Sequence, residues 1–146
     1  MFEWLLGRRN KRPPIQRKTE VEAIAKGASN ELFGALDEAF SVRVRPAANR
    51  LWNKFVEVMD DPVEQAAAAT LTDHFGETYR DFVNELPFFH ERMESDLLEL
   101  LSDWLKTADV IGVGDDFRAL ITKRVADVRN ELFLKSTAYL ANKNPT

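Results

Sequence analysis

The chain has 146 residues, of which 45% are hydrophobic, 30% charged and 10% aromatic, a balance typical of a single globular domain. It contains no cysteine, which excludes disulfides, thiol nucleophiles and cysteine-ligated metal centres. No apolar run reaches the roughly 20 residues that a bilayer span needs, and the short apolar N-terminus precedes its positive charges instead of following them. The sequence therefore predicts a cytoplasmic protein with neither a spanning helix nor a signal peptide.

The first 18 residues differ in composition from the rest of the chain. Their apolar tip consists of Phe2, Trp4, Leu5 and Leu6. The basic residues that follow are Arg8, Arg9, Lys11, Arg12, Arg17 and Lys18. With the single acid Glu3 the segment carries +5, whereas residues 19–146 carry −9. We therefore expect an N-terminal arm (residues 1–18) and a helical bundle domain (residues 19–146).

The arm has several interpretations. An apolar tip followed by basic residues suits an anionic membrane surface, which for a cytoplasmic protein is the inner face of a membrane, or an acidic protein. Nucleic acid is a weaker candidate, because the acidic domain behind the arm would be repelled by phosphates. Alternatively, the arm folds back onto the acidic helices of its own bundle.

Residues 19–146 place apolar side chains at steps of three and four, the spacing of amphipathic helices. The expected helices cover about 19–40, 46–59, 63–86, 89–108 and 115–139. Pro46 and Pro62 suit first helical turns, and Pro87 is expected to close or kink the third helix. Residues 41–45 alternate in polarity, but no partner strand is apparent, so they are expected to form a connector or a kinked helix. The predicted fold is a single-domain, all-α bundle of about five amphipathic helices.

Three large side chains on the apolar stripes are expected in or beside the core. Trp52 and Trp104 lie on the apolar sides of their helices and are predicted to anchor the core. His74 also lies on an apolar stripe, and no second ligand stands at metal spacing from it. It is therefore predicted to be a buried, hydrogen-bonded histidine and not a metal ligand.

The charged residues are sorted along the sequence. Residues 57–116 hold 16 acidic and 3 basic side chains, residues 41–56 hold four basic side chains and no acid, and residues 117–146 hold six basic and two acidic ones. The favoured interpretation is that oppositely charged helices are neighbours whose rims pair. The alternative is an acidic face that docks a basic partner. For this docking face we single out Glu91, Glu94, Glu99 and Asp103.

No arrangement of residues predicts catalysis or cofactor binding. Two histidines without cysteines offer few ligands to a transition metal. The glycines of residues 112–114 lack the third glycine and the preceding strand of a dinucleotide-binding loop. The expectation is therefore a protein that is not an enzyme and uses no cofactor or metal.

The function predicted from the sequence is that of a non-catalytic helical adaptor. Its arm would tether it peripherally to a membrane surface or a partner, and its acidic helices would offer a docking face. A protein partner is expected, and self-association is left open. The alternative function is a nucleic-acid-associated or charge-mimicking regulatory protein, whose acidic helices occupy a basic nucleic-acid-binding surface.

Overall fold

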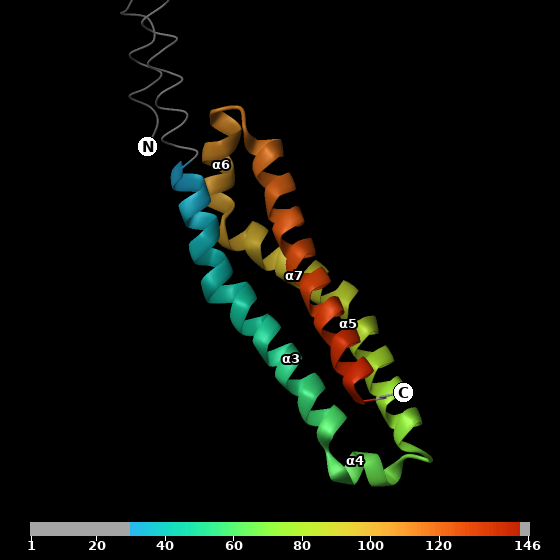
Figure 1. Cartoon of the computed structure of the whole chain (residues 1–146). Helices are drawn as coiled ribbons and strands as arrows, with labels where there is room; N and C mark the ends of the chain where they lie inside the picture. The colour runs from blue at the N-terminus through green and yellow to red at the C-terminus, as the bar shows by residue number, and fades with distance from the viewer. Residues whose placement is uncertain (1–29, 144–146) are drawn as a thin grey trace, which may run out of the picture.

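The structure is a computed structural model that describes residues 30–143. Within this range all regular elements are helices and no strand occurs, so the predicted all-α class is confirmed (Figure 1). Residues 30–39 are helical, and the elements that follow are η1 (Phe40–Val44), α3 (Arg45–Asp60), α4 (Pro62–Ala67), α5 (Leu71–Leu100), α6 (Ser102–Val110) and α7 (Gly114–Lys143). The N-terminal arm and the helix start expected near Thr19 lie outside the described residues.

Residues 30–60 form one long helix where the sequence predicted two. The junction is η1, a π-helical turn in which the backbone N–H of Arg45 donates to the carbonyl of Phe40, five residues back. Pro46 has no N–H to donate, and the wider turn lets the helix pass this position without ending. Of the two expectations for residues 41–45, the kinked continuation of the helix is therefore the right one.

Of the next two helix starts, the sequence predicts the one at Asp61 but not the one at Thr70, which divides the helix expected over 63–86 into α4 and α5. Asp61 accepts a hydrogen bond from the backbone N–H of Val63 and so caps α4. Thr70 accepts from the N–H of Asp73 in the same way and caps α5. Each cap fixes the point at which the chain turns back toward the bundle.

The third and fourth expected helices differ from the structure in their boundaries. Pro87 lies inside α5 and does not close it, because packing of the apolar side chains on both sides of the proline stabilises one continuous helix. The break falls instead at Leu101, between α5 and α6. The stretch expected as one helix over 89–108 is thus divided between two elements.

The turn between α6 and α7 depends on its two glycines. Gly112 has a φ of 82°, a backbone conformation that side-chain-bearing residues rarely adopt. A Cβ atom on Gly114 would lie 1.7 Å from a carboxylate oxygen of Asp109, which is paired with Arg118. Both glycines are therefore required for structural reasons.

The three long helices run up and down the molecule, and α4 and α6 connect them at opposite ends (Figure 1). Helix α5 packs extensively along α7, whereas α3 touches α7 less and rests more on α5. The most deeply buried side chains come from all three long helices: Leu36, Val44, Met59, Leu97, Ile121, Val125 and Ser136. Trp52 and Trp104 are half-buried and pack against this core without lying inside it. Both tryptophans thus pack against the core as predicted, but they are less buried than the prediction of core anchors implies.

Within residues 30–143 no helix is both long and apolar enough to cross a membrane.

Candidate functional site

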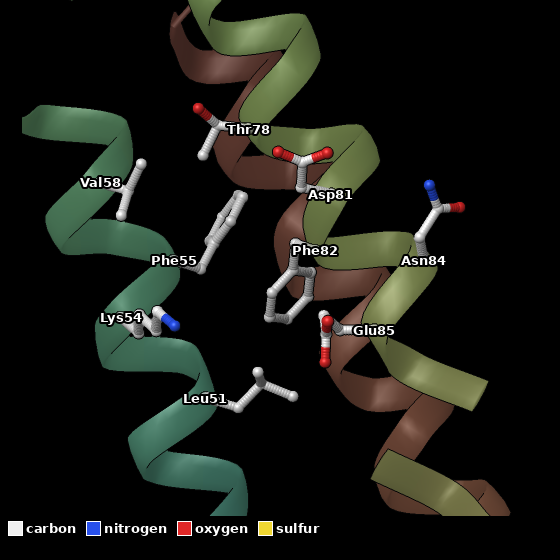
Figure 2. A pocket seen from close by; sticks show the side chains of 9 residues that line it. All are labelled: Leu51, Lys54, Phe55, Val58, Thr78, Asp81, Phe82, Asn84 and Glu85. Atoms are coloured by element: carbon white, nitrogen blue, oxygen red, sulfur yellow. The ribbon is translucent and has the colours of Figure 1, made fainter. Parts of the chain in front are cut away.

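An open groove runs between α3 and α5 (Figure 2). It consists of two neighbouring hollows of about 480 and 370 Å³, which share Leu51, Lys54 and Glu85 as lining residues, and Figure 2 shows the larger of the two. We call the whole feature the α3–α5 groove, the larger hollow its apolar end and the smaller hollow its basic end. Fifteen residues of helix separate Arg43 at one end from Val58 at the other, which corresponds to a length of about 22 Å.

The apolar end is built around two facing aromatic rings. Phe55 of α3 and Phe82 of α5 have ring centroids 4.5 Å apart, and Figure 2 shows them pointing toward each other between the helices. Both rings are almost fully buried, with 3% and 4% of their surface exposed. Leu51 and Val58 extend this surface along α3, while Thr78, Asp81 and Asn84 also line the hollow from α5.

The basic end owes its charge to regular spacing on one helix. Arg43, Arg50 and Lys54 lie seven and four residues apart, so they point to the same side of the helix. Arg92 joins them from α5, and all four side chains belong to exposed residues. The floor below them is apolar and consists of Ala47, Leu51, Phe89 and Met93.

Two acids also line the basic end and lower its charge. Asp96 is half-buried and stands one helical turn after Arg92, and Glu85 lies where the two hollows join. Within residues 30–143 no ion pair within 4.0 Å forms at Arg43, Arg50, Lys54 or Arg92. The basic end therefore presents four cations against two carboxylates, and these cations are not consumed by salt bridges inside the described part of the chain.

Several cations of α7 pair with acids on other elements. Arg124 lies 2.5 Å from Asp37, and Arg118 lies 2.8 Å from Asp109. These contacts agree with the interpretation that oppositely charged helices are neighbours.

Both histidines make contacts within the bundle. The Nε2 of His74 lies 3.0 Å from the carbonyl oxygen of Val58 and 3.2 Å from that of Met59, at the C-terminal end of α3. Carbonyls accept only, so Nε2–H is the donor. The ring adds a second donor to each carbonyl, because the Val58 oxygen also accepts from the backbone N–H of Asp61 and the Met59 oxygen from the Nε2 of Gln65. His74 is 5% exposed, which confirms the prediction of a buried, hydrogen-bonded histidine. Among the described residues, no group of three or more histidine, aspartate or glutamate side chains is arranged to hold a metal ion.

The C-terminal ends of α3 and α7 meet in a small polar cluster. Asp60 accepts hydrogen bonds from the Tyr139 hydroxyl and from Lys143, whose Nζ lies 2.6 Å from the carboxylate. The Lys143 and Tyr139 hydrogen bonds lower the pKa of Asp60 below 3.8. The same contact with Asp60 raises the pKa of Lys143, while burial and the bond to Asp60 raise the pKa of Tyr139.

We expect this cluster to stabilise the fold within a defined pH window. Because the pKa of Asp60 is lowered on folding, its contribution is complete above about pH 3.8 and is lost as the pH falls through the folded value. The raised pKa values of Tyr139 and Lys143 act in the opposite sense, so their contribution is lost on the alkaline side, above about pH 10. Asp60→Asn should lower the free energy of unfolding by about 1 kcal/mol or less at neutral pH, since both side chains are about one-third exposed.

The measurement is urea unfolding of the parent and Asp60→Asn at a series of pH values. The difference between the two should be constant through neutral pH and vanish in acid. Asp61→Asn is the matched control, because asparagine caps a helix as well as aspartate does and should leave stability unchanged. A difference that grows as the pH falls would contradict the assignment.

The structure does not gather the four acids predicted as a docking face into one cluster. Glu94 accepts hydrogen bonds from Thr122 of α7 and from His90, so its carboxylate is engaged inside the bundle. Glu91 and Glu99 are exposed on α5, eight residues apart, which places them about 80° apart around the helix. Asp103 is exposed on α6, 4.0 Å from Lys106. The acidic docking face stays a prediction, and all of the arm residues lie outside the described range.

Sequence reasoning did not identify the α3–α5 groove as a site. The signal was present, since residues 41–56 contain four basic side chains and no acid. Three of these basic residues, Arg43, Arg50 and Lys54, line the groove, whereas Arg45 faces α7 and lies 3.6 Å from Glu131. Only the packing of α3 against α5 shows that an apolar floor lies beside these cations.

No protein-family model, no curated protein and no solved structure matches this chain.

Proposed function

We propose that this protein is a non-catalytic helical adaptor. Its bundle receives a helical segment of a partner protein in the α3–α5 groove, and its N-terminal arm attaches the bundle to an anionic membrane surface. The observation that carries the proposal is the groove itself, which combines an apolar floor with charged rims along about four turns of helix. Grooves of this form are a common way for proteins to bind amphipathic helices.

Two further features support a binding role. The aromatic contact between Phe55 and Phe82 holds the walls of the groove together without a bound partner. Both histidines are engaged in contacts that stabilise the bundle, His74 at the end of α3 and His90 with Glu94. The titratable groups most often used in general acid–base catalysis are thus committed to structure.

Attachment by the arm should require both of its halves. A short apolar tip alone binds membranes weakly, and a basic segment alone is screened by salt. We therefore expect the full chain to float with vesicles containing anionic lipid at low salt. Replacing Trp4 and Leu5 with serine, or Arg8, Arg9, Lys11 and Arg12 with glutamine, should each weaken the association by more than about tenfold.

Salt separates the two contributions in this flotation experiment. The glutamine variant should match the residual binding of the parent at high salt, whereas the serine variant should bind weakly at every salt concentration. Residues 19–146 without the arm serve as the control and should remain with the solvent fraction. If the full chain does not float with anionic vesicles at low salt, the proposed attachment to a membrane is wrong. A gel shift with nucleic acid under the same conditions would instead favour the nucleic-acid-associated alternative.

A further inference from the structure

We propose that the segment bound in the α3–α5 groove is an acidic amphipathic helix of another protein. This inference rests on the proposed binding function of the groove and adds the chemistry of the partner. It follows from three properties of the groove: its shape, the charge of its basic end and the π-helical turn that begins it.

The shape and the floor select a helix. The groove is open along about 22 Å, which matches a helix of about 15 residues lying lengthwise. Leu51 is half-buried on the apolar floor, and Phe55, Phe89 and Met93 lie beneath it with 3% of each surface exposed. The floor therefore offers a shallow apolar contact to side chains spaced three and four residues apart on the partner.

An exposed aromatic residue extends this apolar surface at the rim. Phe88 is 62% exposed and lies on α5 within one turn of Glu85 and Arg92, which both line the groove. Exposed aromatic side chains beside a pocket are frequent energetic anchors of protein interfaces. Phe88 is accordingly the side chain that a bound helix would cover.

The charge selects an acidic partner. Arg43, Arg50 and Lys54 stand on the α3 wall with no acid in its lining, so the carboxylates of an amphipathic helix would meet cations along this wall. On the α5 wall the one cation, Arg92, stands among acids. Arginine is well suited to this role because its guanidinium donates two parallel hydrogen bonds to a carboxylate. Three carboxylates, Asp81, Glu85 and Asp96, line the groove from α5. The whole lining therefore carries four cations against three carboxylates, and the positive surplus lies on the α3 side and at the basic end.

The π-helical turn contributes to this arrangement. Arg43 lies within η1, where each turn contains an extra residue compared with an α-helix, and this turn precedes the straight part of α3. Such turns occur frequently at functional sites. Here η1 carries one of the four cations and joins the helix that holds two more.

Other occupants fit the same groove less well. The arm of this chain is itself basic, so its passage along Arg43 and Arg50 would bring like charges together. Residues 30–143 carry 13 basic and 21 acidic side chains, a net charge of −8 that opposes any polyanion, and nucleic acid brings no apolar side chains to the floor in compensation. An acidic helix is attracted locally by the basic end and supplies the apolar side chains that the floor accommodates.

The test uses the full chain and three designed helical peptides of equal length. All three carry leucine at positions i, i+3, i+4 and i+7, and their flanking residues are glutamate, glutamine or lysine. Fluorescence anisotropy of the labelled peptides gives the affinities at about 0.1 M salt, where charges within about 10 Å still interact. We expect the glutamate peptide to bind at least tenfold more tightly than the lysine peptide, with a difference that narrows as salt is added.

Matched variants locate the binding. Arg43→Glu combined with Arg50→Glu should lower the affinity for the glutamate peptide by at least tenfold. Arg80→Glu combined with Lys106→Glu makes the same change of charge outside the groove and should alter this affinity by less than twofold. Phe88→Ser should weaken the binding of all three peptides alike. Leu134 is a similarly exposed apolar residue on α7, and Leu134→Ser should leave the binding of all three peptides unchanged. Circular dichroism confirms that each variant is folded, and amide chemical shifts in the groove should move when the glutamate peptide is added.

The outcomes separate this inference from the binding function on which it rests. If all three peptides bind equally and Phe88→Ser weakens their binding, the groove is a docking site, but the inference of an acidic partner is wrong. Absence of binding by every peptide would overturn both. If deleting residues 1–18 raises the affinity for the glutamate peptide tenfold, the arm of this chain occupies the groove. If the glutamate peptide dissociates a dimer of the full chain, a second copy of the chain occupies the groove. Either of these results would overturn the inference.

Discussion

Replacing Phe82 with alanine should lower the free energy of unfolding by about 3–5 kcal/mol. The ring is 4% exposed and lies 4.5 Å from that of Phe55 and 6.2 Å from that of Trp52, measured between centroids. Tyr139 of α7 contacts both Trp52 and Phe55, so the aromatic cluster joins all three long helices. Because α3 has few other contacts with α7, the cavity left by Phe82 would loosen the attachment of α3.

Phe88 provides the matched control for this prediction. It is the same residue type on the same helix, six positions later, but it is 62% exposed. Phe88→Ala should change the free energy of unfolding by no more than about 0.5 kcal/mol. Urea unfolding followed by circular dichroism measures both variants. Comparable losses in the two would show that the aromatic cluster does not hold the bundle together.

The second large effect is expected at His74. His74→Leu keeps an apolar side chain of similar volume but removes the donor that serves the carbonyls of Val58 and Met59. Both carbonyls keep another donor, Val58 the backbone N–H of Asp61 and Met59 the side chain of Gln65. We therefore expect a loss of about 0.5–1.5 kcal/mol, the net contribution of a typical hydrogen bond. Chemical or thermal unfolding of the variant provides the measurement.

A second substitution distinguishes the hydrogen bond from packing. His74→Gln retains an N–H donor on a flexible side chain and should recover part of the stability lost in His74→Leu. If the leucine variant is as stable as the parent, the contact with the end of α3 contributes nothing. If glutamine is worse than leucine, the shape of the imidazole matters more than its donor.

The effects at these two positions have a consequence for binding. Phe82 and Val58 both line the apolar end of the α3–α5 groove, and His74 holds the carbonyls at the end of α3 where this groove closes. Substitutions that loosen α3 should therefore widen or collapse the groove as well as destabilise the bundle. Variants intended to test binding are better placed at Arg43, Arg50 and Phe88, which are exposed.

Some properties of this protein follow from the sequence alone. The spacing of apolar residues predicts helices throughout the described range, because a side chain every three or four positions forms one continuous face only in a helix. The cap of α4 can also be predicted from the sequence, because Asp61 and Val63 are two residues apart and their hydrogen bond needs no distant partner. The turn at Gly112 is likewise a local matter, because a positive φ favours glycine wherever it occurs.

Other properties were decided only by the tertiary structure. Pro46 and Pro87 both disfavour a continuous helix locally, yet the chain remains helical at each because apolar packing on either side outweighs the lost hydrogen bond. The pairing of Glu94 with Thr122 and the meeting of Arg92 with the cations of α3 depend on how the helices are rotated and aligned against one another. Periodicity determines which face of a helix is apolar, but not which helix covers that face or which part of it stays open. The α3–α5 groove is therefore a property of the packed bundle and of no single helix.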